Sequence, residues 1–242
     1  MTAKYLLMNL YFFLHERKYK KVRYLFQKNH SKTLAIVFSG LPARGKPVYN
    51  YVMTLKNYKA DKLFVLDDFA YPGGCYMYAN GSDWPMVMVL EFLNRMIKKG
   101  KYSRVITLGS SKGGTCSLYF GLALGVNDIY SGAPAYHLGA YLNKEWHMPM
   151  FQSMMGKNAG KKEQEVLDAL IPDLVEKKSG CDTVVHLMFS KKEHMYRDHI
   201  ADMIVDMDRY GIKHEDWIMD FSKHGEVGKF FVPWIKERLQ VK

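Results

Sequence analysis

Short, uninterrupted apolar runs alternate with longer segments of helical spacing along most of the sequence, and this pattern constrains the fold more than any other feature. The apolar runs are rich in β-branched residues and occupy positions 34–38, 63–66, 105–108, 129–130 and 184–189. The segments of helical spacing occupy positions 86–98, 115–124 and 199–210. Strands that are apolar on both faces are typical of a parallel sheet covered by helices on both sides. The sequence therefore predicts the α/β class with a mostly parallel central sheet.

The chain of 242 residues is predicted to form a single domain, residues 1–242, because no linker or repeat divides it and its length suits one core. The segment at 136–180 lies between two predicted strands and is much longer than an ordinary connection. We therefore expect an insertion that acts as a lid. Residues 22–27 are expected to pair antiparallel at the sheet edge through a turn at 28–31. The apolar run at 5–14 is interpreted as a first strand or a membrane-proximal segment.

A G-x-S-x-G motif, Gly109 to Gly113, directly follows the predicted strand at 105–108 and precedes the helical segment at 115–124. Strand, tight turn and helix are the context that a nucleophile elbow requires. In such an elbow the serine stands in a strained turn, and the glycines let the strand and the helix approach each other. We therefore predict that Ser111 is a nucleophile at the carboxyl end of the sheet. The alternative is a Gly- and Ser-rich turn without chemistry.

A serine nucleophile requires a base and an acid, and both follow the serine in the chain order of this architecture. His224 lies in a loop between an apolar strand predicted at 216–221 and a last predicted helix, which is where the base is expected. Two carboxylates follow the strand before that one. Glu193 is nearer the strand end and is favoured as the acid, with Asp198 as the rival. The acid would fix the tautomer of the imidazole and stabilise its charged form.

An acyl-transfer intermediate also needs hydrogen-bond donors for its oxyanion. The first expected donor is the backbone amide of Lys112, at the positive end of the helix that follows Ser111. The second is expected from the loop after the strand at 34–38, where a backbone N–H of Ser39, Gly40 or Leu41 would face the serine. The alternative interpretation of that loop is a plain turn.

The same loop supports a competing hypothesis of nucleotide hydrolysis. The stretch from Gly40 to Lys46 nearly matches the P-loop pattern, and Asp67 follows an apolar strand as a Mg²⁺-binding carboxylate does. However, Pro47 stands where the metal-binding hydroxyl is required, and proline lacks the N–H that helps to hold phosphate. These differences argue against nucleotide hydrolysis. The three cysteines have no metal-ligand spacing, so no metal is predicted.

The chain has an excess of positive charge, with 35 Lys and Arg against 24 Asp and Glu, a net charge of +11. This excess favours an acidic partner, such as an anionic glycan or the phosphates of a cofactor. No nucleic-acid-binding signature accompanies the basic clusters, so no nucleic acid is expected. No apolar stretch reaches the ~18 residues of a membrane-spanning helix. The first apolar run contains Asn9 and lacks a cleavage site. We therefore expect a cytoplasmic protein, either free or at the inner face of the membrane.

Several groups of residues, taken together, resemble one branch of the α/β-hydrolase superfamily. This branch contains the bacterial capsular polysaccharide O-acetyltransferases and the glycan O-acetyltransferase of the accessory secretion system. The groups are Phe38-Ser39-Gly40, residues 66–72, the Gly-Ser-Ser-Lys-Gly-Gly sequence at 109–114, residues 131–134, and Glu193 with His224. The resemblance runs from about residue 22 to the C-terminus, and the sequence at 109–114 is its most specific element. Gly40 and the insertion depart from the pattern of the family.

The resemblance implies an α/β-hydrolase fold and an O-acetyltransferase. An acetyl group would pass from acetyl-CoA to Ser111, and from there to a hydroxyl of a surface or capsular polysaccharide. His224 would be the base and Glu193 the acid, although several relatives have Asp at the acid position. Two alternatives stay open from the residues alone. One is a carbohydrate esterase or deacetylase with the same Ser-His-Glu triad, and the other is a non-catalytic glycan-binding protein.

Overall fold

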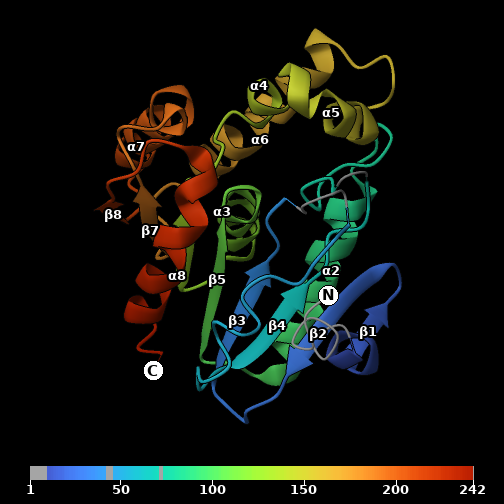
Figure 1. Ribbon diagram of the computed structural model, residues 1–242, viewed down its shortest axis with the longest axis vertical. Coiled ribbons are helices and arrows are strands. Elements are labelled where there is room, and N and C mark those ends of the chain that lie inside the picture. The colour runs from blue at the N-terminus through green and yellow to red at the C-terminus, as the bar shows by residue number, and fades with distance from the viewer. Residues whose placement is uncertain (1–9, 42–45, 71–72, 242) are drawn as a thin grey trace.

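The computed structural model describes residues 10–41, 46–70 and 73–241, and its central element is an eight-stranded sheet with the order β1-β2-β4-β3-β5-β6-β7-β8 (Figure 1). The strands are β1 (Glu16–Tyr19), β2 (Val22–Gln27), β3 (Thr33–Phe38), β4 (Asp61–Val65), β5 (Arg104–Ser110), β6 (Asp128–Gly132), β7 (Val184–Phe189) and β8 (His214–Ile218). The helices and helical turns are α2 (Trp84–Gly100), α3 (Lys112–Leu124), α4 (Leu138–Leu142), η2 (Glu145–His147), α5 (Met148–Met155), α6 (Lys161–Lys177), η3 (Tyr196–Ile200), α7 (Ala201–Arg209), η4 (His224–Glu226) and α8 (Val227–Arg238).

The predicted mostly parallel sheet is confirmed. The strands from β3 to β8 pair with one another in parallel, and β2 alone runs antiparallel to both of its neighbours. The five apolar runs coincide with β3, β4, β5, β6 and β7. The strand predicted at 216–221 is β8, which begins earlier and ends at Ile218. The carboxyl ends of the parallel strands therefore meet at one edge of the sheet, where the predicted site residues follow them.

In the N-terminal region, the structure differs from the expected partner of residues 22–27 and from the strand interpretation of the run at 5–14. Residues 22–27 do form a strand, but it pairs with β4 and not with the strand that follows it, and β1 lies outside it at the sheet edge. The reason is that β3 pairs with β4 on one side and with β5 on the other, so neither of its edges is free for β2. Within the run at 5–14, residues 10–14 are helical and not a strand, and residues 5–9 lie outside the described residues.

The core has two layers because alternate residues of the strands face opposite sides of the sheet. Leu34, Ile36 and Phe38 of β3 pack with α2, α3, α6 and α7 on one side. Ala35 and Val37 pack with α8 on the other side. Local sequence also places the helices. For example, α2 has Pro at its first turn and two lysines in its last turn, which suit the free N–H groups and the negative end of a helix.

The predicted insertion folds into α4, η2, α5 and α6, between β6 and β7. Figure 1 shows these helices grouped beyond the carboxyl ends of β3, β4 and β5. The insertion therefore lies on the side of the sheet where the motif residues are. Among the described residues, no helix has the length and hydropathy needed to cross a bilayer.

Candidate active site

The turn between β5 and α3 has the geometry of a strained elbow. Ser111 has a φ of 54° and a ψ of −124°, which a non-glycine residue adopts only when its surroundings hold it there. Its backbone N–H donates to the carbonyl oxygen of Gly132 at 2.7 Å, which ties the turn to the end of β6. The side chain of Ser111 is thereby presented at the carboxyl edge of the sheet.

The glycines of the motif are required by close backbone approaches. A Cβ atom on Gly109 would lie 2.3 Å from the carbonyl oxygen of Gly113, and a Cβ on Gly113 would lie 2.7 Å from the carbonyl oxygen of Phe38. A Cβ on Gly114 would lie 2.6 Å from the carbonyl oxygen of Gly132. Each distance is shorter than a real Cβ contact. The extension of the motif to a second glycine therefore reflects the packing of α3 against two neighbouring strands.

Ser111, His224 and Glu193 lie together in a hydrogen-bonded chain. The Oγ of Ser111 is 2.6 Å from Nε2 of His224, and Nδ1 of His224 is 2.5 Å from Oε1 of Glu193. The Glu193 side chain is fully buried, and its Oε2 has no hydrogen-bond partner among the described residues. His224 opens η4 after β8, and Glu193 follows β7, so three separate strands position the three groups. A buried carboxylate in this position stabilises a proton on the imidazole.

Asp198, the rival for the acid, lies elsewhere. Its carboxylate accepts hydrogen bonds from Arg197 at 2.9 Å and from Lys144 at 3.4 Å. Burial acts to raise the pKa of Asp198, but the hydrogen bonds from these two cations outweigh it and leave the pKa below its ordinary value. Asp198 is therefore an ion-pair partner on η3, and it makes no hydrogen bond with His224.

The backbone amides expected to bind the oxyanion differ in whether they already have a hydrogen-bond partner. The amide of Lys112, at the first position of α3, makes no hydrogen bond with the described residues and lies next to Ser111. The N–H of Ser39 donates to the hydroxyl of Tyr76 at 2.8 Å. The N–H of Gly40 is also engaged, with Oδ1 of Asn50 at 3.0 Å. The loop after β3 thus lines the site, but neighbouring side chains accept the hydrogen bonds of its Ser39 and Gly40 amides.

A phenol that the sequence analysis did not identify lies at the nucleophile. Tyr141, on α4 of the insertion, is buried, and its hydroxyl interacts with the side chain of Ser111. Its ring packs on His147 with centroids 4.5 Å apart. Burial raises the pKa of Tyr141 to about 12, so the hydroxyl keeps its proton at neutral pH and can donate it in a hydrogen bond. No motif or periodicity in the insertion singles out this tyrosine.

A buried ion pair lies next to the turn that carries Ser111. The ammonium of Lys112 contacts the carboxylate of Asp67, which follows β4, and both side chains are only 1% exposed. Burial acts to lower the pKa of Lys112, but the Asp67 charge raises it and keeps the lysine protonated. The ammonium also lies 5.0 Å from the ring centre of Tyr76, whose hydroxyl holds Ser39. The residue after the nucleophile is therefore anchored by its own side chain.

This ion pair contradicts the nucleotide-hydrolysis hypothesis. Asp67, the expected Mg²⁺ ligand, is buried against Lys112 and cannot hold a solvated metal. The P-loop pattern also requires a helix directly after its lysine, whereas residues 46–50 are irregular. The remaining positions of the pattern, 42–45, lie outside the described residues.

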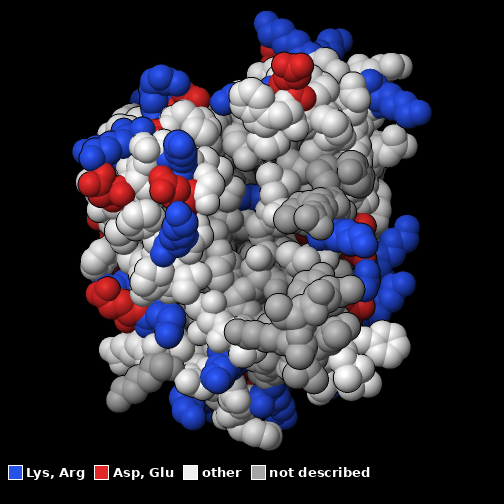
Figure 2. Space-filling model, viewed as in Figure 1, with Lys and Arg blue, Asp and Glu red and all other residues white. Residues whose placement is uncertain are grey.

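Ser111 and His224 line a cavity of about 480 Å³ between the insertion and the start of α8. Figure 2 shows the molecular surface hollowed between the part formed by α7 and α8 and the part formed by α4 and α5. The described residues that line the cavity include no carboxylate. They are Gly40, Leu41, Asn50, Tyr51, Ser110, Ser111, Tyr141, Lys144, Trp146, His147, His194, His224, Gly225, Val227 and Gly228. A cavity of this size accommodates a small substrate.

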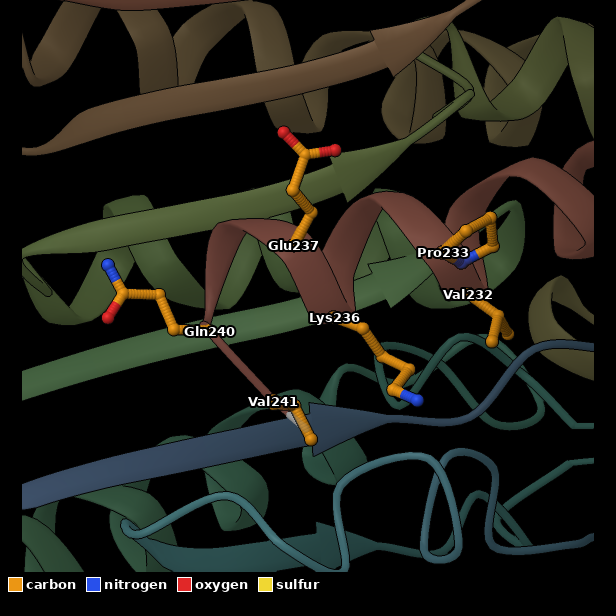
Figure 3. Close-up of a pocket in the computed structure, with 6 residues that line it drawn as sticks. All are labelled: Val232, Pro233, Lys236, Glu237, Gln240 and Val241. Atoms are coloured by element: carbon orange, nitrogen blue, oxygen red, sulfur yellow. The ribbon is translucent and has the colours of Figure 1, made fainter.

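A second cavity, of about 600 Å³, lies along α8 and the residues after it. Its lining residues are Val232, Pro233, Lys236, Glu237, Gln240 and Val241 (Figure 3). They include no serine, cysteine or histidine. This cavity therefore lacks the groups for acyl transfer.

A mostly parallel sheet with a serine elbow after β5 defines an α/β-hydrolase fold, and solved structures agree with this assignment. A variant of the capsule O-acetyltransferase of Neisseria meningitidis serogroup A, in complex with CoA, has a TM-score of 0.75 and 20% identity over 93% of this chain and 94% of its own. A glycosylation-associated protein complex of Streptococcus agalactiae has a TM-score of 0.71 and 17% identity, over 94% of this chain and 46% of that one. A fluorophosphonate-binding serine hydrolase of Staphylococcus aureus has a TM-score of 0.59 and 16% identity, over 88% and 91%.

No protein-family model matches the sequence, and no curated protein matches it. The likeness to solved structures therefore concerns the fold. At that level, this chain shares its fold with the capsule O-acetyltransferase of Neisseria meningitidis serogroup A and with the glycosylation-associated protein complex.

Proposed function

We propose that the protein is a serine O-acetyltransferase that moves an acetyl group from acetyl-CoA to a hydroxyl of a bacterial surface or capsular polysaccharide. The observation that carries the proposal is the hydrogen-bonded chain from Ser111 through His224 to buried Glu193, at the edge of a cavity. The fold it shares with a capsule O-acetyltransferase and its resemblance to that branch support the substrate class.

In the first step, the Ser111 hydroxyl attacks the acetyl carbonyl carbon while Nε2 of His224 takes its proton. Glu193 stabilises the imidazolium through Nδ1. The Lys112 amide and the Tyr141 hydroxyl donate to the oxyanion, in place of the amides of Ser39 and Gly40. Acetyl-CoA supplies the acetyl group as a thioester, and His224 returns the proton to the departing sulfur. The cavity, with Lys144 and His147 in its wall, would receive the acetyl end of the donor.

In the second step, His224 removes the proton of a sugar hydroxyl, whose oxygen attacks the acetyl carbon on Ser111. The bond to Oγ then breaks, and Oγ recovers a proton from His224. Transfer in preference to hydrolysis requires that water be kept from the ester. The insertion at 136–180, which supplies Tyr141 and Lys144 to the cavity, would serve as the lid that does so.

The test is to incubate the protein with acetyl-CoA, with and without bacterial polysaccharides, and to follow CoA release and Ser111 acetylation by mass spectrometry. We expect CoA release that depends on the acceptor. Ser111→Ala and His224→Ala should each lower the rate by about 10³-fold or more, and Glu193→Ala by about 10²-fold. The matched control Asp198→Ala should stay within about threefold of the wild type.

Three outcomes contradict parts of this proposal. Turnover of simple acetyl esters that is indifferent to the polysaccharide identifies an esterase or deacetylase. If the wild type is as inert as Ser111→Ala, the protein is a non-catalytic binding protein. Full activity of Glu193→Ala together with an inactive Asp198→Ala shows that the acid is misassigned.

A further inference from the structure

One large aromatic side chain in the wall of the active-site cavity is turned to solvent. Trp146 is 72% exposed, and it is the most exposed of the four tryptophans, all of which are described. An indole is a large apolar surface, which proteins ordinarily bury against their own side chains. Trp146 instead lines the same cavity as Ser111 and His224. An exposed ring in that position offers a flat contact surface to a ligand.

A series of ring contacts links Trp146 to Ser111. Trp146 lies in η2, and its ring meets that of His147 at 6.2 Å in an edge arrangement. The His147 ring packs on Tyr141 at 4.5 Å, and the Tyr141 hydroxyl interacts with Ser111. Because Tyr141 is buried, this series connects the exposed indole to the nucleophile through a rigid support. A group held on the indole is thereby held at a set distance from the reacting atom.

The rest of the cavity selects the kind of ligand. Hydrogen-bonding groups of Asn50, Lys144 and His194 also line the cavity, and no carboxylate lines it among the described residues. Lys144 is paired with Asp198, so its charge is partly compensated. A sugar ring fits this combination, because its faces carry C–H groups that pack on an aromatic ring while its hydroxyls form hydrogen bonds at the rim. The lack of carboxylates disfavours a cationic ligand and admits a neutral or an anionic sugar.

We propose that the indole of Trp146 is an acceptor subsite, on which a pyranose ring of the polysaccharide stacks so that one of its hydroxyls faces acetylated Ser111. This inference rests on the proposed transfer reaction. The stacked sugar supplies the oxygen that forms the new ester bond, the bond from the acetyl carbon to Ser111 Oγ breaks, and the hydroxyl proton passes through His224 to Oγ. Trp146 acts on the second step alone, because acetylation of Ser111 needs no sugar.

The kinetic test compares Trp146→Ala and Trp146→Phe with the wild type in the two steps separately. The first step is read as acetyl-Ser111 formed from acetyl-CoA without acceptor, and the second as the KM for a polysaccharide acceptor. We expect Trp146→Ala to form acetyl-Ser111 within about twofold of the wild-type rate and to raise the acceptor KM at least ~10-fold. Trp146→Phe keeps a flat ring and should restore most of the affinity. Phe13→Ala, a control at an exposed aromatic outside the cavity, should change neither value.

A second measurement is independent of turnover. Short oligomers of glucose, of N-acetylglucosamine and of sialic acid are titrated into Ser111→Ala protein while tryptophan fluorescence is followed. We expect a saturable change with at least one oligomer, and no such change in the Ser111→Ala, Trp146→Phe protein. If wild-type protein forms no acetyl-Ser111 from acetyl-CoA, the transfer reaction fails, while this titration still decides on the subsite.

Two results overturn the subsite. One is a Trp146→Ala protein that acetylates Ser111 slowly but has an unchanged acceptor KM, which assigns the indole to the donor. The other is a titration in which none of the three oligomers produces a change that depends on Trp146.

Discussion

Tyr141 provides a hydroxyl where the sequence predicted a backbone amide. The prediction relied on the loop after β3, whose amides face the serine in a nucleophile-elbow architecture. In this protein, Tyr76 and Asn50 accept the hydrogen bonds from that loop. The Tyr141 hydroxyl interacts with Ser111 from the opposite wall of the cavity. A phenol that keeps its proton is among the side chains that stabilise a developing oxyanion.

We therefore expect Tyr141→Phe to lower kcat about 10- to 100-fold with little change in the KM for acetyl-CoA. The substitution removes one hydroxyl and keeps the ring that packs on His147 and His199. Steady-state kinetics with acetyl-CoA, and with p-nitrophenyl acetate as a simple ester, check this. Tyr58→Phe, outside the cavity, is the matched control. A fully active Tyr141→Phe together with an inactive Leu41→Pro, which removes the next amide of the loop, would assign the donor to Leu41 instead.

The individual site residues that could be predicted from the sequence are those whose positions follow from strand ends and from chain order. Ser111, Glu193 and His224 each follow a strand that could be recognised, and the structure brings them together. Tyr141 could not be predicted, because its approach depends on how the insertion folds back over the sheet. Asp67 was recognised at a strand end, but its partner was not, because nothing in the sequence indicates that the lysine next to Ser111 turns inward.

Among the elements, the helix expected at 199–210 has one feature that its spacing did not predict. The region is helical, but its first residues belong to a π-helical turn at Tyr196–Ile200 before α7. Such turns widen the helix locally and are frequent at functional sites. This one places His199 in the interior, where Nδ1 accepts a hydrogen bond from the His137 amide at 3.4 Å and Nε2 has no partner among the described residues.

Burial lowers the pKa of His199 to about 4, and the nearby charges of His137 and Lys144 act in the same direction, against Asp198. Above pH 6.5, the folded and unfolded states both hold this histidine neutral. Between pH 6.5 and about 4, the unfolded chain binds a proton that the folded protein does not, so the free energy of unfolding falls as the pH falls. The slope from this one group is at most about 1.4 kcal/mol per pH unit.

We expect His199→Phe, which cannot titrate, to flatten the fall in stability between pH 6.5 and 4.5. Urea unfolding midpoints at several pH values measure the slope, and the comparison uses slopes because the substitution also changes packing. His30→Phe, at an exposed histidine, should leave the slope as it is in the wild type. Parallel curves for the wild type and His199→Phe would show that His199 already titrates normally.

For the whole molecule, the feature that bears on function is the charge. The net charge of +11 is spread over the surface, with Lys and Arg side chains around the rim of the face that contains the hollow (Figure 2). Charge distributed in this way attracts a long polyanion from a distance, and salt screens the attraction over about 10 Å at 0.1 M. A small neutral ester carries no net charge, so this attraction does not act on it.

We therefore expect kcat/KM for an anionic polysaccharide to fall several-fold between 50 and 300 mM NaCl, as estimated from screening. Hydrolysis of p-nitrophenyl acetate by the same protein should be unchanged, which controls for effects of salt on the triad. An equal response of the two substrates would place the salt effect in the protein itself and remove the case for an anionic acceptor.

The fold as a whole was predictable because a parallel sheet buried on both faces leaves an unmistakable pattern of apolar runs. The pairing partner of β2 could not be predicted in this way, because its apolar pattern is compatible with pairing to either β3 or β4. The helical residues 10–14 were missed for a related reason, since a short apolar run does not by itself distinguish a strand from a helix.

The contact between Lys112 and Asp67 also has a consequence for the order in which the surroundings of Ser111 assemble during folding. Asp67 follows β4 and Lys112 follows β5, and β3 separates these two strands in the sheet. Until all three are side by side, the lysine has no counter-ion and its amide has no fixed direction. Under the proposed function, the support that this ion pair gives to Ser111 therefore depends on the assembly of all three strands.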